Sequence, residues 1–297
     1  MRKIFLALLG VIFILIGLVG LIVPVMPGWL FVFAGLSLIA PKLAERLKNR
    51  IFRKFFKKDI VYLEEWRKRP VHAGFTTRHL PLVLHKTDDL LNPSNQDTFR
   101  KFFPDKKKFA LLNQVHEDKI VVLEDEAQFP KEGFYHFLKA DAVITPVRGL
   151  TLLVMTADCL SVFFVTPGPD PWVGLAHAGW RGTQKQITRR TVELIAEKSK
   201  CLPRDVHIAF GPCIGKEQYE VGGEFKGLFP KKSLHFKRDK VYFNLSGENR
   251  RQLLEAGVLE KNILDHAICT VSENEDFYSF RKEKDAAGRL VSFITKL

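Results

Sequence analysis

The first 40 residues carry the feature that most restricts how this chain folds, an uninterrupted apolar stretch of 20 residues from Ile4 to Val23. A helix of that length spans the ~30 Å hydrocarbon core of a bilayer. The whole segment 1–40 contains only two charged residues, Arg2 and Lys3. Because this segment lacks a polar face for water, the chain is expected to join a membrane segment to a soluble domain.

A turn follows this first apolar run. Residues 24–28 read Pro-Val-Met-Pro-Gly, and they end the helix because proline removes backbone donors and glycine permits a turn. The second apolar run, Trp29 to Ala40, is short for a full span but reaches back across the bilayer when the turn residues are included. Residues 23–29 resemble the motif of the PGPGW transmembrane family.

Basic residues flank both ends of residues 1–40, with Arg2 and Lys3 before them and Lys42 through Lys58 after them. By the positive-inside rule both ends are cytoplasmic, so a transmembrane helical hairpin is predicted. The alternative is a cleaved signal peptide, which is disfavoured because the apolar region exceeds the usual 7–15 residues. The hairpin predicts location at the inner (cytoplasmic) membrane, with the soluble domain facing the cytoplasm and membrane lipid as a partner.

Most of the net charge of +13 lies near this hairpin. Residues 41–70 contain eleven Lys/Arg against four Asp/Glu, and only +4 remains for residues 71–297. The charge therefore suits anionic lipid head groups and does not indicate nucleic-acid binding by the soluble domain. The spacing of the apolar residues in segment 41–70 predicts a basic juxtamembrane helix with an aromatic face towards the lipid interface. A solvated linker helix is the alternative.

Short apolar strands alternate with helices from residue 71 to 297, which predicts one α/β (α+β) domain with a mixed sheet. Two helices are expected, one capped by a Thr183/Gln186 box before Ile187, the other capped by Ser246 and stopped at Gly257. Strand order does not follow from the pattern. The four cysteines have no close paired spacing, which favours a reducing compartment. The predicted strands are Ala110–Val115, Ala142–Thr145, Thr151–Thr156, Val173–Ala176 and Val206–Phe210.

Three residues that commonly bind metals lie at or close behind predicted strand ends: His116, Cys159 and His177. Strand ends let a rigid sheet present side chains to a shared pocket. One thiolate and two imidazoles suit zinc, and three protein ligands leave one position open, as a catalytic zinc requires. The spacings of 43 and 18 residues are weak evidence by themselves, because lone strand histidines are often core or surface residues.

Longer motifs surround these residues and run in order from about Ala73 to Leu297. They are Gly74-Phe75-x-Thr77-Arg78, Asn113-Gln114-Val115-His116, Ala157-Asp158-Cys159-Leu160, Ala176 to Thr183, Gly211 to Gly215 with Tyr219-Glu220-Val221, Asn249-Arg250-x-Gln252-Leu253, and Phe277-x-Ser279-x-Arg281 before Gly288-Arg289. Together these motifs resemble the YfiH-like family. That family is also called the polyphenol oxidase or multicopper oxidoreductase laccase family and is viewed as purine nucleoside phosphorylases.

The resemblance implies that His116, Cys159 and His177 are zinc ligands and that the substrates are a purine nucleoside and phosphate. It implies two reactions, phosphorolysis of adenosine- or inosine-type nucleosides and deamination of adenosine. Arg78 is implied in binding substrate or phosphate, and Arg181 is a second guanidinium suited to phosphate.

Proton transfer in these reactions is assigned to Asp158 or Glu220. Each of these residues, and Arg181, also has a purely structural interpretation. Asp158 would orient a ligand histidine, Glu220 would favour the start of a helix, and Arg181 would form a salt bridge beside Trp180.

This chain departs from the family pattern after Arg78. Where the family usually has a Gly-Gly-x-Ser turn, residues 79–82 read His-Leu-Pro-Leu. A segment that usually carries Asn and Gly-Asp is replaced by residues 84–89, Leu-His-Lys-Thr-Asp-Asp, and Lys282 stands where a second arginine is common. The motifs around the metal ligands are intact, so the departures bear on substrate preference.

Three other functions stay open at this point. Cys159 as nucleophile with His177 as base would make a metal-independent hydrolase. A copper-dependent polyphenol oxidase, suggested by the family's older name, is less favoured because the chain has no His-x-His pair. A membrane-anchored binding module without turnover is the non-enzymatic alternative. No sequence pattern indicates an oligomeric state.

Overall fold

The computed structural model describes residues 58–103, 105–129, 132–137 and 139–297. The expected transmembrane hairpin, and residues 41–57 of the expected linker helix, lie outside the described residues. Within the described ranges, no helix is both long enough and apolar enough to cross a bilayer.

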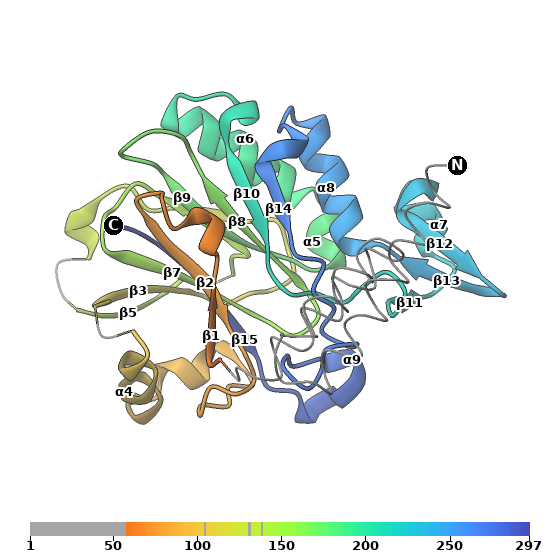
Figure 1. Ribbon diagram of the computed structural model, residues 1–297, viewed down its shortest axis with the longest axis horizontal. Coiled ribbons are helices and arrows are strands. Elements are labelled where there is room, and N and C mark those ends of the chain that lie inside the picture. The colour runs from red at the N-terminus through yellow and green to blue at the C-terminus, as the bar shows by residue number, and fades with distance from the viewer. Residues whose placement is uncertain (1–57, 104, 130–131, 138) are drawn as a thin grey trace, which may run out of the picture. The chain divides into compact units, whose positions relative to one another are not determined.

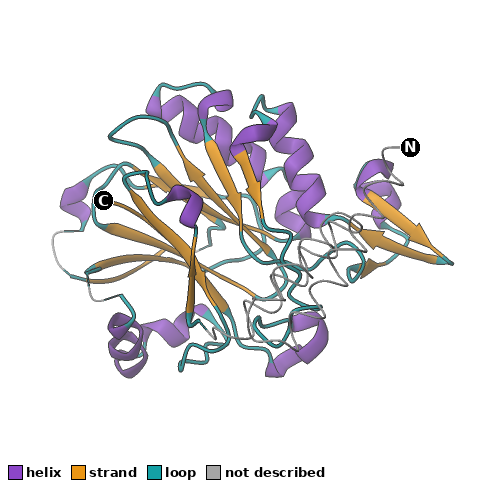
Figure 2. Ribbon diagram, in the orientation of Figure 1, coloured by secondary structure: helices purple, strands orange, loops and turns teal. Residues whose placement is uncertain are grey.

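Two six-stranded mixed sheets form the centre of the fold (Figures 1 and 2). Sheet A mixes antiparallel and parallel pairs, and the C-terminal strand β15 lies in its middle, between β2 and β7. In sheet order its strands are β1 (Ile60–Tyr62), β2 (Val71–Thr76), β15 (Leu290–Lys296), β7 (Leu150–Thr156), β3 (Lys108–Leu112) and β5 (Gly133–Phe137).

Sheet B has three antiparallel pairings at its centre, β10 with β8, β8 with β9 and β9 with β6. Parallel pairs close both of its edges. In sheet order its strands are β14 (Ile263–Asp265), β10 (His207–Phe210), β8 (Leu160–Val165), β9 (Val173–Ala178), β6 (Ala142–Thr145) and β4 (Ile120–Val122). The mixed α/β architecture predicted from the sequence is confirmed.

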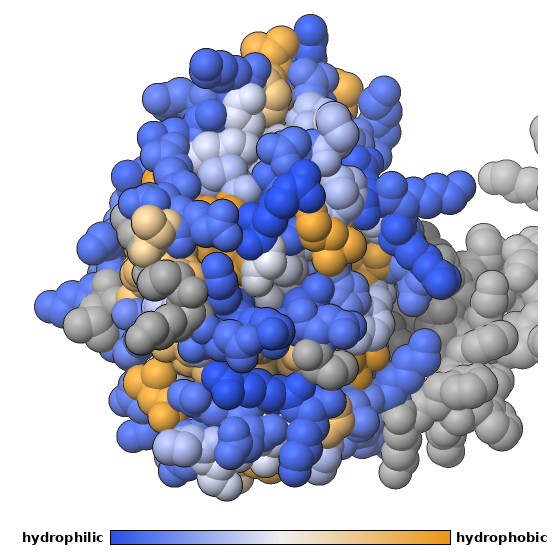
Figure 3. All heavy atoms as spheres, turned by 90° about the vertical axis from the view of Figure 1, so that its left-hand side faces the viewer, coloured by the Kyte–Doolittle hydropathy of each residue, from blue (hydrophilic) through white to orange (hydrophobic). Residues whose placement is uncertain are grey.

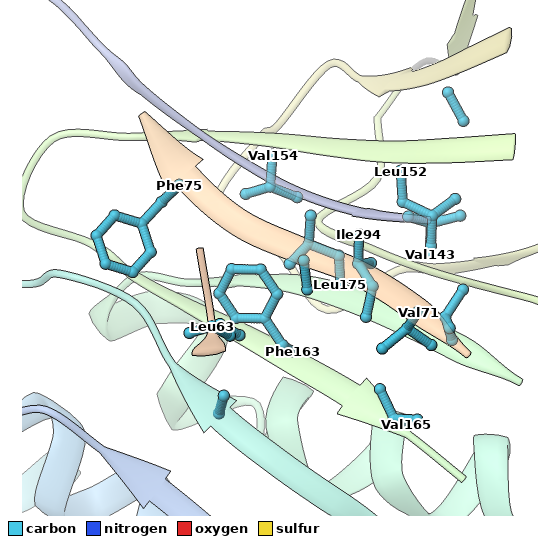
Figure 4. Close-up of a cluster of buried hydrophobic side chains, with 14 of the residues drawn as sticks. Leu63, Val71, Phe75, Val143, Leu152, Val154, Phe163, Val165, Leu175 and Ile294 are labelled. Atoms are coloured by element: carbon cyan, nitrogen blue, oxygen red, sulfur yellow. The ribbon is translucent and has the colours of Figure 1, made fainter. Parts of the chain in front are cut away.

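The main apolar core lies between the two sheets, as Figure 4 shows. Leu152 and Val154 of β7 face it from sheet A, and Phe163 of β8 and Leu175 of β9 face it from sheet B. The intervening residues point to the outer faces, where they meet helices. Strands covered on both sides read as continuous apolar runs, as β7, β8 and β9 do, and β7 and β9 were predicted from the sequence whereas β8 was not.

Helices cover the outer face of each sheet. Two longer helices, α6 (Ile187–Ser199) and α8 (Leu245–Glu255), pack over sheet B, and the short α5 (Trp180–Gln184) precedes them. The outer face of sheet A is covered by α4 (Pro93–Lys101) and the 3-10 turn η2 (Thr87–Leu91). The face seen in Figure 3 is largely polar with scattered apolar spots, as expected when most apolar side chains point inward.

A small three-stranded sheet stands beside this arrangement, in the order β11 (Glu220–Val221), β13 (Lys240–Phe243) and β12 (Leu234–Lys237). Two four-residue helices complete the secondary structure near it and near the C-terminus, α7 (Phe225–Leu228) and α9 (Phe280–Glu283). The remaining 3-10 turns are η1 (Glu64–Trp66), η3 (Glu126–Gln128), η4 (Pro203–Asp205), η5 (Lys231–Ser233), η6 (Glu260–Asn262) and η7 (Lys284–Ala286).

The structure differs from the expected linker helix at residues 60–66. Ile60 to Tyr62 pair with β2 as the edge strand β1, and η1 follows. Leu63 and Trp66 are buried in the core between the sheets, with the Trp66 ring 6.4 Å from that of Phe163. Burial of these side chains outweighs the local helical pattern, and the compact unit accordingly begins at Asp59.

Both expected helix caps also differ from the structure. Thr183 lies buried inside α5, and Gln186 precedes α6 in a left-handed conformation without a side-chain cap. The second helix is capped by Asn244, whose side chain accepts from the Gly247 N–H at 3.0 Å, two residues before the predicted Ser246. Either residue type suits an N-cap, so the tertiary position of the preceding strand decides which one is used.

Candidate metal centre

The three expected ligands converge. His116 Nε2 or Nδ1, Cys159 Sγ and a ring nitrogen of His177 all lie within 4.8 Å of one another. The Cys159 sulfur is 4.0 Å from His116 Nε2, and the two imidazole rings stand perpendicular with centroids 4.7 Å apart. Among the described residues this is the one group of three or more His, Cys, Asp or Glu side chains with such geometry.

Convergence follows from where the two sheets meet at one end. His116 follows the C-terminal end of β3, and residues 157–159 carry the chain from β7 in sheet A to β8 in sheet B. His177 lies on β9, opposite Ser161 of β8. The cluster therefore bridges both sheets. Two backbone positions here are strained, His116 with φ 60° and Asp158 with φ 86°, which is typical of residues fixed by a functional site.

Asp141, at the start of β6, organises this cluster. Its carboxylate accepts three successive backbone N–H bonds, from Val115, His116 and Glu117, at 2.9–3.1 Å. The same carboxylate lies 2.7 Å from His177 Nδ1. It therefore fixes the His116 loop and leaves the other nitrogen of His177 facing the cluster, as carboxylates behind metal-binding histidines do. Asp141 was not among the predicted site residues, and the role of orienting a ligand histidine was predicted as the structural alternative for Asp158.

Gly179 provides the space for the cluster. A Cβ at this position would lie 3.0 Å from Cys159 Sγ, 3.2 Å from His116 Cδ2 and 3.8 Å from His177 Cε1. The glycine therefore allows the backbone to pass directly behind all three ligands.

Electrostatics favour a thiolate at Cys159, the form that binds a metal, and a protonated imidazole at His177, which must lose its proton to bind one. Burial raises the pKa of the Cys159 thiol, but the charges and hydrogen bonds of His177 and His116 outweigh it and lower that pKa to about 6. Burial lowers the pKa of His177, whereas Cys159 and Asp141 raise it to about 9. Burial raises the pKa of Asp141, but His177 and the backbone N–H groups outweigh burial and lower that pKa overall. A cation between the ligands would replace the proton shared by this thiolate and imidazole.

The donor set and spacing fit a zinc ion. Zinc takes tetrahedral N and S ligands, and bonds of about 2.05 and 2.3 Å put a nitrogen and a sulfur ligand roughly 3.6 Å apart. The observed 4.0 Å between Cys159 Sγ and His116 Nε2 is close to that separation. Three ligands with a free side towards a pocket match a catalytic zinc site and do not supply the several histidines that a multinuclear copper cluster requires.

The cluster opens into a cavity of about 800 Å³, large enough for a small organic substrate. Apolar and aromatic residues of the lining include Ile214, Tyr219, Leu245 and Phe280. The charged residues of the lining are Lys86, Asp88, Asp158, Arg281, Lys284 and Arg289, besides the ligands themselves. Three residues of the whole lining, Lys86, Thr87 and Asp88, lie where the chain departs from the family pattern.

Asp158 lines the cavity, but both of its carboxylate oxygens are engaged. One accepts the Thr270 hydroxyl at 2.6 Å, and the other accepts the Arg281 backbone N–H at 2.5 Å. The residue thus ties the connection between the sheets to the segment before β15. This arrangement is suited to positioning Arg281.

The other three expected site residues do not line the cavity. The Arg78 guanidinium donates to the Asn274 carbonyl and binds Glu283 at 2.9 Å, so it holds the 274–283 segment. Arg181 is exposed and lies 4.4 Å from the centroid of the Trp180 ring. The Glu220 carboxylate pairs with Lys240 at 2.8 Å, on β11 and not at a helix start.

Several motif residues turn out to be structural. The Gln114 amide bonds both the N–H and the C=O of Met155, which continues the β3–β7 pairing beyond the end of β3. Asn249 of α8 is fully buried and bonds Thr183 and Thr188, while Gln252 bonds the Thr183 carbonyl. These contacts fix α5 and α6 behind the Gly179 turn and so support the cluster.

Fold and site together define a two-sheet α/β protein with a cavity built on an open His–Cys–His cluster. The chain belongs to the family described as multi-copper polyphenol oxidoreductase laccase, whose model matches residues 77–296. Residues 3–54 match the model of the PGPGW transmembrane family. The resemblance drawn from the motifs is therefore confirmed.

Relatives with enzyme names support an enzyme of this general kind. The "Purine nucleoside phosphorylase YlmD" of Bacillus subtilis is 28% identical over 263 residues, 79% of this chain and 93% of the relative. "Adenosine deaminase RL5", from an unknown prokaryotic organism, is 29% identical over 203 residues, 62% of this chain and 74% of the relative. The crystal structure of the Bacillus licheniformis hypothetical protein YfiH superposes with a TM-score of 0.69 and 26% identity, covering 80% and 97% of the two chains.

Proposed function

We propose that this protein is a zinc-dependent purine nucleoside enzyme that phosphorolyses adenosine- or inosine-type nucleosides and deaminates adenosine. The observation that carries the proposal is the convergence of His116, Cys159 and His177 at the mouth of a cavity large enough for a nucleoside. The names of the two relatives, a purine nucleoside phosphorylase and an adenosine deaminase, give the reaction classes.

Different residues of the cavity lining would bind the purine and the phosphate. Tyr219 and Phe280, two aromatic residues of the lining, offer ring faces for a purine. The Arg281 guanidinium, 5.3 Å from the Tyr219 ring centroid, and Arg289 offer cationic groups for phosphate. This assignment moves the phosphate-binding role from Arg78 and Arg181, whose side chains are directed elsewhere, to two arginines nearer the cluster.

In phosphorolysis a phosphate oxygen forms a bond to ribose C1′ while the glycosidic C–N bond breaks, and the purine leaves with that electron pair and takes up a proton. His116, Cys159 and His177 would hold the zinc ion, which supplies Lewis-acid chemistry beside the substrate. Asp141 keeps the ligands in place. Asp158 acts as a positioning residue, since its carboxylate holds the Arg281 backbone.

The test is incubation of the zinc-loaded full-length protein with adenosine, with and without phosphate. Adenine and ribose 1-phosphate are expected only with phosphate, and inosine in either case. Absence of all three products would refute the substrate assignment. The Cys159→Ala protein is expected to lose zinc and turnover together.

The alternative function is metal-independent hydrolysis by Cys159 and His177. It is supported by the pKa of Cys159, which is lowered to about 6. The perpendicular packing of the second imidazole, His116, favours a metal, since a thiol–imidazole pair needs one histidine only. Protein stripped of zinc by a chelator separates the two, because a thiol hydrolase would retain its activity.

For the N-terminal part we propose a helical hairpin over residues 1–40 that holds the enzyme at the cytoplasmic face of the inner membrane. The 20-residue apolar run from Ile4 to Val23 and the match of residues 3–54 to a transmembrane family support this. Membrane fractionation with protease protection tests it. A protein that appears in the soluble fraction without detergent would contradict the hairpin.

A further inference from the structure

Two chain segments far apart in sequence both contribute cationic side chains to the lining of the cavity. Residues 86–88 and residues 280–289 both line it, and His85 Nδ1 lies 3.3 Å from the Ala287 carbonyl, which joins the two segments. Together they contribute four cationic side chains to the cavity, Lys86, Arg281, Lys284 and Arg289.

In the described part of the chain none of these four side chains forms an ion pair within 4.0 Å, although Asp89 acts on Lys86 and both Asp158 and Asp285 act on Arg289 at longer range. Arg281 Nη1 donates to the Glu220 carbonyl, and Arg289 Nη1 donates to the Ala287 and Gly288 carbonyls. Lys86 and Lys284 are exposed, and neither has an ion-pair partner within 4.0 Å in the described part of the chain. The lining also holds two acidic residues, Asp88 and Asp158, and the two oxygens of Asp158 accept hydrogen bonds from uncharged donors.

Lys284 is also held in an unfavourable backbone conformation. Its φ of 55° and ψ of −133°, directly after α9, belong to a region that favours glycine. A lysine at such a position keeps a charge on the cavity wall where glycine would be more stable. Strain of this kind is concentrated at binding sites.

We propose that the preferred substrate class is a purine nucleoside 5′-monophosphate, whose 5′-phosphate binds Lys86 and Lys284. A phosphate monoester carries nearly two negative charges at neutral pH. Arg281 and Arg289 then remain for the orthophosphate of phosphorolysis. A neutral nucleoside would leave both lysines without an anion. This inference rests on the proposed function, because it names the substrate of the same cavity.

The experiment measures binding of AMP and of adenosine to the zinc-loaded full-length protein by calorimetry in phosphate-free buffer. AMP is expected to bind at least tenfold more tightly, and its affinity is expected to fall as salt is raised. Lys86→Met and Lys284→Gly are each expected to weaken AMP binding about tenfold, the size of one charge-assisted hydrogen bond, and to leave adenosine binding unchanged within about twofold.

Two features of these variants exclude misfolding as the explanation. Lys284→Gly removes the backbone strain, so its melting temperature is expected to rise while AMP binding falls. Lys282→Met is the matched control, since Lys282 is exposed two residues away and does not line the cavity. AMP should bind this control as it binds the unaltered protein.

Equal affinity for AMP and adenosine would overturn the inference. So would an equal loss of orthophosphate binding in the two lysine variants, because the lysines would then serve the co-substrate. Turnover is scored separately. Conversion of adenosine without a preference for AMP refutes only this inference, whereas tight AMP binding without turnover of either compound refutes only the proposed reaction.

Discussion

At the scale of single residues, Asp141 does more for the cluster than any other side chain behind the ligands. It is completely buried, and its carboxylate joins three N–H groups of the His116 loop to the His177 ring. Replacing Asp141 by Asn keeps the shape but removes the charge. Zinc affinity is expected to fall about 10- to 100-fold, the usual loss when a group supporting a metal ligand is changed. Competition with a zinc chelator measures this.

The control for that substitution is Asp88→Asn, which changes an exposed carboxylate on the same cavity. Its zinc affinity should match that of the unaltered protein. If Asp141→Asn binds zinc equally well, Asp141 does not support the metal ligands.

Gly179 gives a second prediction at this scale. In Gly179→Ala the new methyl group would contact Cys159 Sγ at 3.0 Å and His116 Cδ2 at 3.2 Å, so one ligand has to move. We expect roughly a tenfold or greater loss of zinc affinity. Gly223→Ala, where an added Cβ meets nothing within 4 Å, is the control. Normal zinc binding by Gly179→Ala would show that the cluster is more adaptable than the structure indicates.

The sequence predicted the three ligand residues because they lie at strand ends inside long motifs. Asp141 was not predicted, although the sequence holds a signal for it, because an acidic residue directly precedes the apolar strand Ala142–Thr145. The expected roles of Arg78, Arg181 and Glu220 depend on side-chain direction. Their partners Glu283, Trp180 and Lys240 are set by tertiary packing, which one-dimensional spacing does not contain.

At the scale of elements, helix α8 anchors the region behind the cluster, and Glu248 is its buried charge. The carboxylate bonds Arg251, Gln252 and Ser233. Burial opposes ionisation, but these partners lower the pKa of Glu248 below its ordinary value of 4.5. A lowered folded-state pKa means that the stabilisation is complete above about pH 4.5 and is lost as the pH falls through the folded-state value.

Glu248→Gln is therefore expected to be less stable than the unaltered protein at pH 7 and to show a flatter decline of stability below pH 5. Urea unfolding at a series of pH values measures both effects. Glu197→Gln, at an exposed position of α6, is the matched control and should keep the original pH profile. Parallel pH profiles for Glu248→Gln and the unaltered protein would contradict the assigned role.

At the scale of the whole molecule, the α/β class and some of the strands could be predicted, whereas β2, β8 and β15 and the arrangement of the sheets could not. Strand β6 matches its expected range, and β7 and β9 extend theirs by one and two residues. The place of β15 between β2 and β7 joins residues more than 130 positions apart. Hydrophobic runs identify such strands but do not specify which partners they take.

The central claim is that one zinc ion is bound by two imidazoles and one thiolate. Zinc-edge X-ray absorption on the purified full-length protein, with metal content measured on the same sample, tests it directly. We expect one zinc per chain, with nitrogen or oxygen neighbours near 2.0–2.1 Å and one sulfur near 2.3 Å that disappears in Cys159→Ala. Zinc content near zero, or a zinc ion without a sulfur neighbour, would contradict the account.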